Sequence, residues 1–326
     1  MSGKVRKAVI TAAGRGTRQY PASSAVQKEM FPLVDRDGLA KPVIQIIGEE
    51  AIAAGVEEIC IVTQPGEARQ YRDYFRRMTD ETLGAFDGKP WAHEASEKLE
   101  EFGRRLTFVS QDSPEGYGHA VYQARAFVGD EPFLLLLGDH IYISATEAYC
   151  AAQLIRKYGE SGCEAMTALQ ATPSQRLHLF GTVKGRALDA ADGVYHIERI
   201  VEKPSEAYAA EHLRTPGLAP GTYLCHFGMH VFPPAIFEAL GHHIEHDIRE
   251  KGEIQLTSAQ EFMRAKLLTD GYAGCTIEGQ RFDTGIPYGL MESQLALALA
   301  GKHRSEITEA IARLLAEQLH TVAGRA

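Results

Sequence analysis

The sequence predicts an α/β fold in which a mainly parallel sheet is flanked by helices. Over the first 140 residues, short apolar runs alternate with stretches of helical periodicity, a pattern typical of βαβ units. Some of these runs, such as FLLLL at 133–137, are apolar throughout rather than alternating. Strands of that kind are covered on both faces, which favours parallel pairing.

The expected elements of this first part follow one another along the chain. Helices are expected at about 43–54 and 67–77 and after Gly118. Residues 78–104 interrupt the alternation, and we expect one short helix there without a catalytic role. Strands are expected at 8–13, 57–64, 105–111 and 132–139.

Strand-like runs dominate the later part of the chain. Residues 163–172, 181–204 and 222–232 are of this type and are separated by Gly and Asp turns. Residues 305–320 instead have the periodicity of an amphipathic helix, whose apolar stripe either packs against its own domain or forms a subunit interface. The stripe consists of Ile307, Ile311, Leu314, Leu315 and Leu319.

Composition limits the class of protein. The 326 residues suffice for one large domain or two smaller ones, and the net charge of −9 without a basic block argues against a nucleic-acid partner. No apolar stretch approaches the about 20 residues of a membrane helix, and the N-terminus shows no signal sequence. The five cysteines form no C-x-x-C pair. We therefore expect reduced, buried cysteines and a cytoplasmic protein without a membrane partner.

A glycine loop with two cations predicts a phosphate-binding site. Gly14 and Gly16 allow a tight turn whose backbone N–H groups face an anion, and Thr17 adds a hydroxyl. Arg18 and Lys28 add positive charge, the arginine as a fork for two oxygens and the lysine as a point charge. A nucleoside triphosphate is the expected ligand.

Two common phosphate-binding motifs are excluded by spacing. A Rossmann fingerprint would need glycine at the position of Gln19, and a Walker A loop needs Gly-Lys-Ser/Thr, which is absent. The loop therefore belongs to another class of nucleotide-binding protein.

A glutamine and two glycines predict the site for the base. Gln111 ends an expected strand, and Gly116 and Gly118 precede an expected helix. A primary amide offers both a donor and an acceptor, as the edge of a pyrimidine requires. His119 follows the second glycine, and we favour a structural role at the helix start over a role as catalytic base.

Two aspartates predict a magnesium site. Asp139 follows the apolar run 134–138, and ligands of open α/β sheets bind at the carboxyl ends of strands. Mg²⁺ is usually held by one or two carboxylates together with substrate phosphates. Asp283, in the segment FDTG, is the candidate for the second carboxylate.

A charged pair before a proline predicts a second phosphate contact. Pro204 favours an extended conformation for Lys203, whose ammonium group can then project towards a phosphate, with Glu202 beside it. The alternative is a surface ion pair. The histidine-rich segment 241–247 is interpreted as a solvated surface rather than a metal site.

Eight sequence fragments within residues 7–300 resemble segments of the sugar-phosphate nucleotidylyltransferases and occur in the same order as in that family. Within the family, the resemblance is strongest to the bacterial uridylyltransferases that act on glucose 1-phosphate. The resemblance implies a nucleotide-diphospho-sugar transferase fold with a mixed, Rossmann-like sheet. It also implies a domain at 1–300, with a nucleotide-binding half at 1–140 and a sugar-binding half at 141–300, followed by a C-terminal helix at 301–326. The fragments are the opening 8–33, 52–63, 111–121, 134–139, 180–181, 201–205, 252–257 and 282–285.

The resemblance also implies roles for single residues. Arg18 and Lys28 would handle the triphosphate and Lys203 the sugar phosphate, as catalytic residues. Asp139 and Asp283 would bind Mg²⁺. The sugar pocket would be lined by Gly181, Glu202, Lys203 and Gly228. The nucleotide would contact Ala13, Gly14, Gly16, Thr17, Glu29, Gln111 and Gly116.

The implied reaction is Mg²⁺-dependent transfer of a uridylyl group from UTP to α-D-glucose 1-phosphate, giving UDP-glucose and pyrophosphate. The sugar phosphate is already an anion, so alignment and charge neutralisation suffice without a covalent intermediate. The alternatives are dTTP, CTP or another hexose 1-phosphate as substrate, or a regulatory homologue without turnover. A homo-oligomer, dimer or tetramer, is expected.

Overall fold

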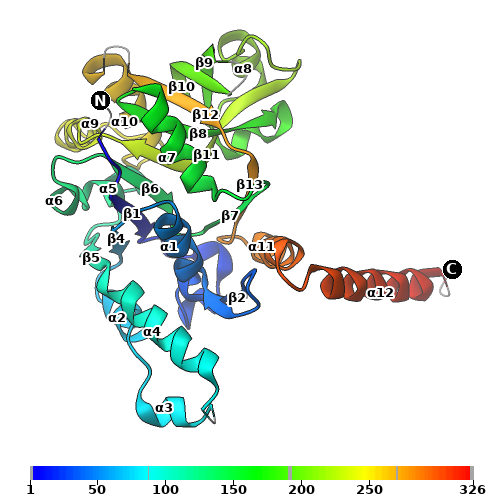
Figure 1. The fold of residues 1–326 in the computed structure, drawn as a ribbon. Helices are drawn as coiled ribbons and strands as arrows, with labels where there is room; N and C mark the ends of the chain where they lie inside the picture. Colours follow the sequence, from blue (N-terminus) through cyan, green and yellow to red (C-terminus); the bar gives the residue numbers. More distant parts are fainter. Residues whose placement is uncertain (1–2, 87, 190–192, 269–270, 324–326) are drawn as a thin grey trace. The chain divides into compact units, whose positions relative to one another are not determined.

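A computed structural model describes residues 3–86, 88–189, 193–268 and 271–323 of the chain (Figure 1). The chain divides into two compact units. Unit 1 comprises Met1–Gly14, Ala51–Leu137 and Ala151–Ile277. Unit 2 comprises Arg15–Glu50, Gly138–Cys150 and Glu278–Ala326.

Unit 1 contains a sheet of nine described strands. The strands β5, β4, β1 and β6 pair in parallel, as the alternation of strands and helices predicts. The sheet becomes mixed at β11, which pairs antiparallel with β6 and β8, and the predicted α/β fold class is thereby confirmed. In spatial order the strands are β5 (Leu106–Ser110), β4 (Glu58–Thr63), β1 (Lys7–Ala12), β6 (Phe133–Leu137), β11 (Thr222–Phe232), β8 (Ala165–Pro173), β12 (Tyr272–Thr276), β10 (Val194–Glu202) and β9 (Gly181–Asp189).

The apolar core of unit 1 is shared by the central strands and the helices α5, α9 and α10, which pack against one another. Phe133 of β6 stacks on Phe237 of α9 with ring centroids 5.3 Å apart, and both rings are buried. The helices of unit 1 are α2 (Ala68–Tyr74), α3 (Asp80–Gly84), α4 (Pro90–Arg104), α5 (Tyr117–Tyr122), α6 (Arg125–Val128), α7 (Cys150–Ser161), η4 (Ser174–Leu179), α8 (Glu206–His212), α9 (Ala235–Glu245), α10 (Leu256–Phe262) and the π-helix η5 (Met263–Leu267), while α1 (Val43–Ala53) crosses the boundary of the units.

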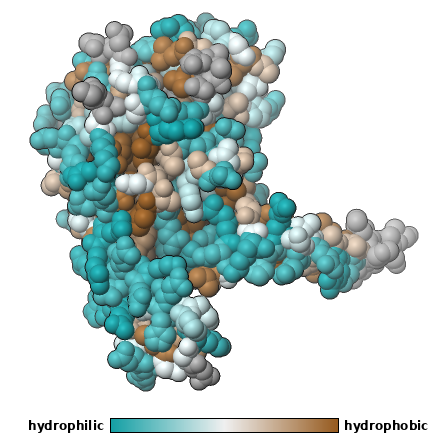
Figure 2. Space-filling model, in the orientation of Figure 1, coloured by the Kyte–Doolittle hydropathy of each residue, from teal (hydrophilic) through white to brown (hydrophobic). Residues whose placement is uncertain are grey.

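The expectation of one short helix in residues 78–104 is wrong, because the segment holds α3 and the fifteen-residue α4. Pro90 occupies the first turn of α4, where its missing N–H costs nothing. The helix buries Phe102, which stacks on Phe75 with centroids 4.7 Å apart. Trp91, in the first turn of α4, is half exposed. Figure 2 shows a few hydrophobic (brown) residues among mostly hydrophilic ones on the surface in this part of the view. The largely polar composition of α4 hides its narrow apolar stripe.

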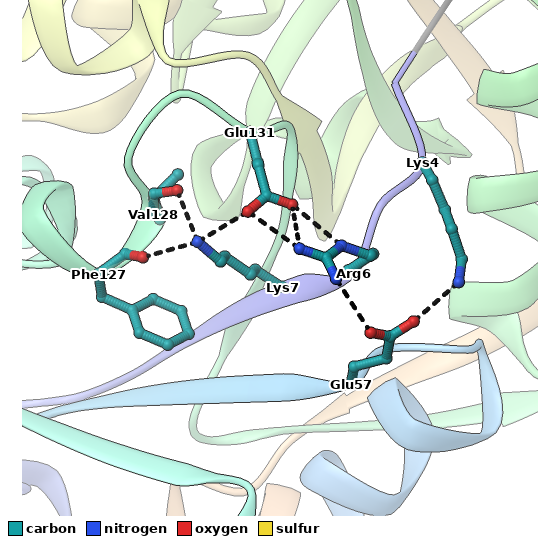
Figure 3. Close-up of polar contacts among 7 residues, drawn as sticks. All are labelled: Lys4, Arg6, Lys7, Glu57, Phe127, Val128 and Glu131. Atoms are coloured by element: carbon teal, nitrogen blue, oxygen red, sulfur yellow. Dashed lines mark hydrogen bonds and ion pairs between the residues drawn. The ribbon is translucent and has the colours of Figure 1, made fainter.

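Charged side chains join the elements at the start of β1 (Figure 3). The ammonium of Lys7 donates to the carbonyl oxygens of Phe127 and Val128, both at 3.1 Å, and lies 3.0 Å from Glu131 Oε1. Arg6 binds both oxygens of Glu131, and its Nη1 lies 3.3 Å from Glu57 Oε2. These contacts hold the N-terminal ends of β1 and β4 and the turn before β6 together.

Unit 2 contains short strands and the C-terminal helices. In the antiparallel pair β7 and β13, Asp283 lies opposite His140. The expected C-terminal helix is confirmed, with Ile307 and Ile311 partly buried and Leu314 and Leu315 exposed; the Leu319 side chain lies outside the described part. The elements are η1 (Thr17–Gln19), η2 (Ala22–Ser24), η3 (Lys28–Met30), β2 (Pro32–Val34), β3 (Ala40–Pro42), β7 (His140–Ser144), β13 (Gly279–Asp283), α11 (Pro287–Ala300) and α12 (Arg304–Ala323).

The cysteines are free, and four of the five are buried, with Cys163 partly exposed. Among the described residues, no helix combines the length and the apolarity needed to cross a bilayer.

Candidate active site

The glycine loop forms the turn that the sequence predicts. Gly16 has a left-handed backbone, with φ of 62°, and precedes η1, which begins at Thr17. A Cβ at Gly16 would lie 3.0 Å from the Cβ of Ser23, so glycine satisfies both the backbone and the space. The guanidinium of Arg18 is exposed and lies 3.8 Å from Asp283 Oδ2.

Lys28 binds the aspartate that the sequence assigns to the metal. Its Nζ donates to Asp139 Oδ2 at 2.5 Å and lies 3.5 Å from Glu29 Oε1. All three side chains are largely buried. Within the described residues, the buried Glu29 Oε1 makes no hydrogen bond, and its polar contact is the ion pair with Lys28.

Burial and the neighbouring charges set the ionisation of this cluster. Burial raises the pKa of Glu29 to about 8, and Lys28 opposes this effect only in part. Burial acts on Asp139 in the same direction, but the hydrogen bond from His140 and the charge of Lys28 hold its pKa well below the usual range. Burial opposes the charge of Lys28, yet the charges of Asp139 and Glu29 outweigh it and raise the Lys28 pKa. The surroundings therefore favour the charged forms of Lys28 and Asp139 and the protonated form of Glu29.

The segment after β13 closes the same site. Both the N–H and the hydroxyl of Thr284 donate to the carbonyl oxygen of Asp139, at 2.8 and 2.9 Å. The amide of Gln19 donates to the carbonyl of Thr284, and Gly285 N–H donates to Asp283 Oδ1 at 2.7 Å. These bonds tie the glycine loop and both aspartates into one arrangement.

The donor atoms of Asp139, His140 and Asp283 all lie within 4.8 Å of one another, and they form the one such cluster in the described part of the chain. Two carboxylates in this spacing fit a divalent cation completed by phosphate oxygens. The sequence interpretation missed His140, whose Nδ1 lies 2.9 Å from Asp139 Oδ1. His140 could have been found from the sequence, because it directly follows Asp139.

In unit 1, Gln111 directly follows β5 and Gly116 directly precedes α5, as the sequence predicts. Its Nε2 donates to the carbonyl of Gly116 at 3.1 Å and lies 3.1 Å from His119 Nδ1. These two contacts engage the amide nitrogen, so the side chain offers chiefly its carbonyl oxygen to a base. His119 Nε2 lies 3.1 Å from the Gln123 amide, so the ring is held between two amides, as a structural role requires.

Three of the predicted sugar-side residues, Gly181, Glu202 and Lys203, lie together in unit 1. Gly181 and Glu202 are partners across β9 and β10. A Cβ at Gly181 would lie 3.2 Å from Glu202 Oε2 and 2.8 Å from His226 Nδ1, so both side chains converge on the glycine. Gly228, with φ of 91°, lies within the irregularity of β11.

The expectation that Lys203 is extended is wrong. Its φ of 45° is left-handed, although Pro204 follows. The backbone N–H donates to the carbonyl of Phe180 at 3.2 Å, and the ammonium lies 3.2 Å from Glu202 Oε1. The tertiary contact with Phe180 supports a conformation that the local proline rule disfavours.

In the histidine-rich segment 241–247, His243 is buried, and its Nδ1 donates to the carbonyl oxygen of Ala239 at 2.8 Å. His242 stacks on Phe262 with ring centroids 4.3 Å apart. The solvated-surface interpretation is therefore wrong for these two histidines. At the opening strand, Ala13 is buried, and the carbonyl of Gly14 accepts from Gln64 Nε2 at 3.3 Å, a contact that the sequence did not indicate.

Comparison with known proteins identifies the class. A family model described as nucleotidyl transferase matches residues 7–298, and the chain belongs to this family. It is 36% identical over 300 residues to the UTP–glucose-1-phosphate uridylyltransferase of Bacillus subtilis, with 92% of this chain and 93% of that one covered. It is 35% identical over 303 residues to the enzyme of the same name from Streptococcus pneumoniae, with 92% of each chain covered.

Solved structures of similar proteins share the fold. The UTP-bound UGPase from Acinetobacter baumannii matches with a TM-score of 0.74 and 29% identity, over 95% of this chain and 99% of that one. A UDP-glucose pyrophosphorylase complexed with UDP-glucose matches with a TM-score of 0.72 and 28% identity, over 90% of this chain and 98% of that one. The predicted family and fold type are confirmed.

Proposed function

We propose that the chain catalyses the transfer of a uridylyl group from UTP to α-D-glucose 1-phosphate, giving UDP-glucose and pyrophosphate. The observation that carries this proposal is the similarity, over at least nine-tenths of each chain, to relatives that bear the name of this activity. The ion-pair cluster in unit 2 and the Gly181–Glu202–Lys203 group in unit 1 supply suitable chemistry.

The proposed reaction is one displacement at the α-phosphorus of UTP. An oxygen of the sugar phosphate forms the new P–O bond, the bond to the β-phosphate bridging oxygen breaks, and pyrophosphate carries away the electron pair. Arg18 and Lys28 neutralise the phosphates of UTP, and Lys203 neutralises the sugar phosphate. Because the nucleophile is already an anion, no side chain has to remove a proton from it.

Asp139 and Asp283 would hold Mg²⁺, which when bound offsets the charge that develops on the phosphate oxygens. The close carboxylates support this assignment. When the cation is bound, Asp139 would contact it in place of Lys28. The ammonium group of Lys28 could then bind a phosphate.

The two halves of the domain would divide the substrates. Gln111 and Gly116 in residues 1–140 would contact the base. Ala13, Gly14, Gly16, Thr17 and Glu29 would also contact the nucleotide. Gly181, Glu202 and Gly228 in residues 141–300 would surround the sugar. The convergence of Glu202 on Gly181 supports this division.

The test is an initial-rate panel of UTP, dTTP, CTP, ATP and GTP against glucose 1-phosphate and galactose 1-phosphate, read as pyrophosphate release. We expect the highest kcat/KM for UTP with glucose 1-phosphate and poor rates with purines. Comparable turnover with ATP would refute the assignment of the base site, and no turnover with any pair would refute the activity.

A separate experiment tests the metal. EDTA should abolish turnover and Mg²⁺ should restore it, and Mg²⁺ with UTP should raise the Tm of the unaltered protein. Asp139→Asn should keep the fold by circular dichroism and lose both the turnover and that Tm shift. Full activity of the variant would remove Asp139 from the metal site.

The assembly and the location are also proposals. The helix α11 exposes Tyr288, Met291, Leu295 and Leu299, and this apolar stripe supports a homo-oligomer, a dimer or tetramer. Light scattering after gel filtration should give a mass above that of one chain. The free cysteines support a reducing compartment, the cytoplasm.

A further inference from the structure

The helix α10 brings a hydroxyl against the proposed sugar-binding carboxylate. Thr257 ends the GEIQLT segment and lies in the first turn of α10, and its Oγ1 donates to Glu202 Oε2 at 2.7 Å. The carboxylate belongs to the last residue of β10. The contact therefore joins two segments 55 residues apart in the sequence.

With the hydrogen bond from Thr257, each carboxylate oxygen of Glu202 has a partner within the protein. The other oxygen, Oε1, lies 3.2 Å from the ammonium of Lys203. The backbone of Gly181 leaves space for Oε2 on a third side, because a Cβ there would approach it to 3.2 Å. Each carboxylate oxygen has about two acceptor positions, so one on each remains for a hydroxyl of a ligand.

A glutamate without such partners rotates about three side-chain bonds, and ordering it when a ligand binds costs affinity. The hydrogen bond to Oε2 and the ion pair at Oε1 remove part of this cost before the ligand arrives. The Glu202 side chain is largely buried, with 18% of its surface exposed. This burial strengthens both contacts, because charge-assisted interactions gain from the partial exclusion of water.

We propose that Thr257 is a positioning residue for sugar recognition, whose hydroxyl holds the Glu202 carboxylate in the orientation that accepts the hydroxyl groups of the hexose phosphate. The inference rests on the proposed function, because it takes the sugar to be the ligand of Glu202. Thr257 acts through Glu202 and is not itself placed against a reacting atom.

A second hydrogen bond joins α10 to β10, so the positioning role of Thr257 can be tested without detaching the helix from the strand. Glu261, one turn further along α10, accepts the backbone N–H of Ile200 in β10 at 3.0 Å. The helix therefore remains attached to the strand when the Thr257 hydroxyl is removed. Ser258, the next residue, donates its hydroxyl to the carbonyl of Gln255 within the same turn and provides a matched control.

The test compares Thr257→Val, Thr257→Ser and Ser258→Ala in the full-length protein. Thr257→Val preserves shape and removes the donor, so we expect the KM for glucose 1-phosphate to rise about tenfold, with the KM for UTP changed less than about twofold. Thr257→Ser should restore the KM to within about threefold of the unaltered value. Ser258→Ala should leave both values unchanged.

Calorimetric binding gives a readout that does not depend on turnover. Thr257→Val should weaken the binding of UDP-glucose and leave the binding of UDP unchanged. In a Glu202→Ala background, the same substitution should have no further effect, because the group that it positions is gone.

The possible failures are distinct. If the unaltered protein binds UDP but not UDP-glucose, the proposed function fails and this inference fails with it. If it binds both, and Thr257→Val weakens both equally or neither, the proposed function stands and the positioning role of Thr257 is refuted. A loss caused by Thr257→Val that persists in the Glu202→Ala background would also refute it.

Discussion

The substitution Gly285→Ala tests the cluster in unit 2 by filling its centre. A Cβ at this position would lie 2.7 Å from Asp139 Oδ2, 2.9 Å from Asp283 Oδ1 and 3.3 Å from Arg18 Nη2. The added methyl group thus meets the three side chains that we assign to the metal and the phosphates. The Gly285 backbone is not left-handed, so alanine is compatible with the turn itself.

The expected magnitude follows from these distances. Unbonded carbon atoms prefer contacts of about 3.5–4.0 Å, so the carboxylate oxygens have to move by roughly 0.5–1 Å. A misplacement of about 1 Å can cost about 10²-fold in rate, and we expect a loss of this size in kcat/KM. The fold should survive, because alanine lowers the conformational entropy of the unfolded chain. This effect stabilises the folded state by about 0.4–1 kcal/mol and offsets part of the strain. The Tm should stay within about 3 °C of the original.

The assay is initial-rate kinetics at saturating Mg²⁺, combined with thermal unfolding with and without Mg²⁺ and UTP. Gly159→Ala in α7 is the matched control, because its Cβ would meet no atom within 4 Å. That variant should keep its kcat/KM and gain up to about 1 kcal/mol of stability. If Gly285→Ala folds and retains normal kcat/KM, the two aspartates do not lie at the reacting phosphates.

Three other expectations can be checked with standard assays. Gly181→Ala, which places a Cβ 3.2 Å from Glu202 Oε2, should raise the KM for glucose 1-phosphate about tenfold and spare UTP; equal effects on both would contradict the sugar assignment. Lys203→Ala should lose roughly 10²–10³ in kcat, whereas a normal kcat with only the KM for UTP altered would move Lys203 to the nucleotide side. In the folded protein, at most Cys163 should react quickly with Ellman's reagent at pH 8, because the thiolate is the reactive form and burial raises the pKa of thiols such as Cys60 to about 12. All five should react after unfolding, and rapid reaction of several cysteines in the folded state would show that the core opens.

Local sequence rules predicted the features that depend on neighbouring residues. The left-handed turn at Gly16 follows from glycine chemistry, and the position of Asp139 follows from the apolar strand before it. The helix at 43–54 and the C-terminal helix follow from apolar periodicity. In each case the deciding interactions lie within one turn or one strand of the residue concerned.

Features that depend on distant segments were not predictable in this way. The left-handed Lys203 is held by the carbonyl of Phe180, which no rule for the residue before proline can include. The Gln111 amide is engaged by Gly116 and His119, so its free acceptor could not be read from residue type alone. The hydroxyl of Thr257 meets Glu202 only because α10 packs against β10.

Selection for stability and selection for turnover should favour different residues at position 203, because of the left-handed backbone of Lys203. A left-handed conformation costs an L-residue roughly 1 kcal/mol, whereas glycine adopts it freely but carries no charge. A library of variants screened for resistance to heat should therefore enrich glycine at this position. The same library screened for turnover should retain lysine. A disagreement between the two screens at this position would therefore identify Lys203 as a functional residue without any knowledge of the substrate.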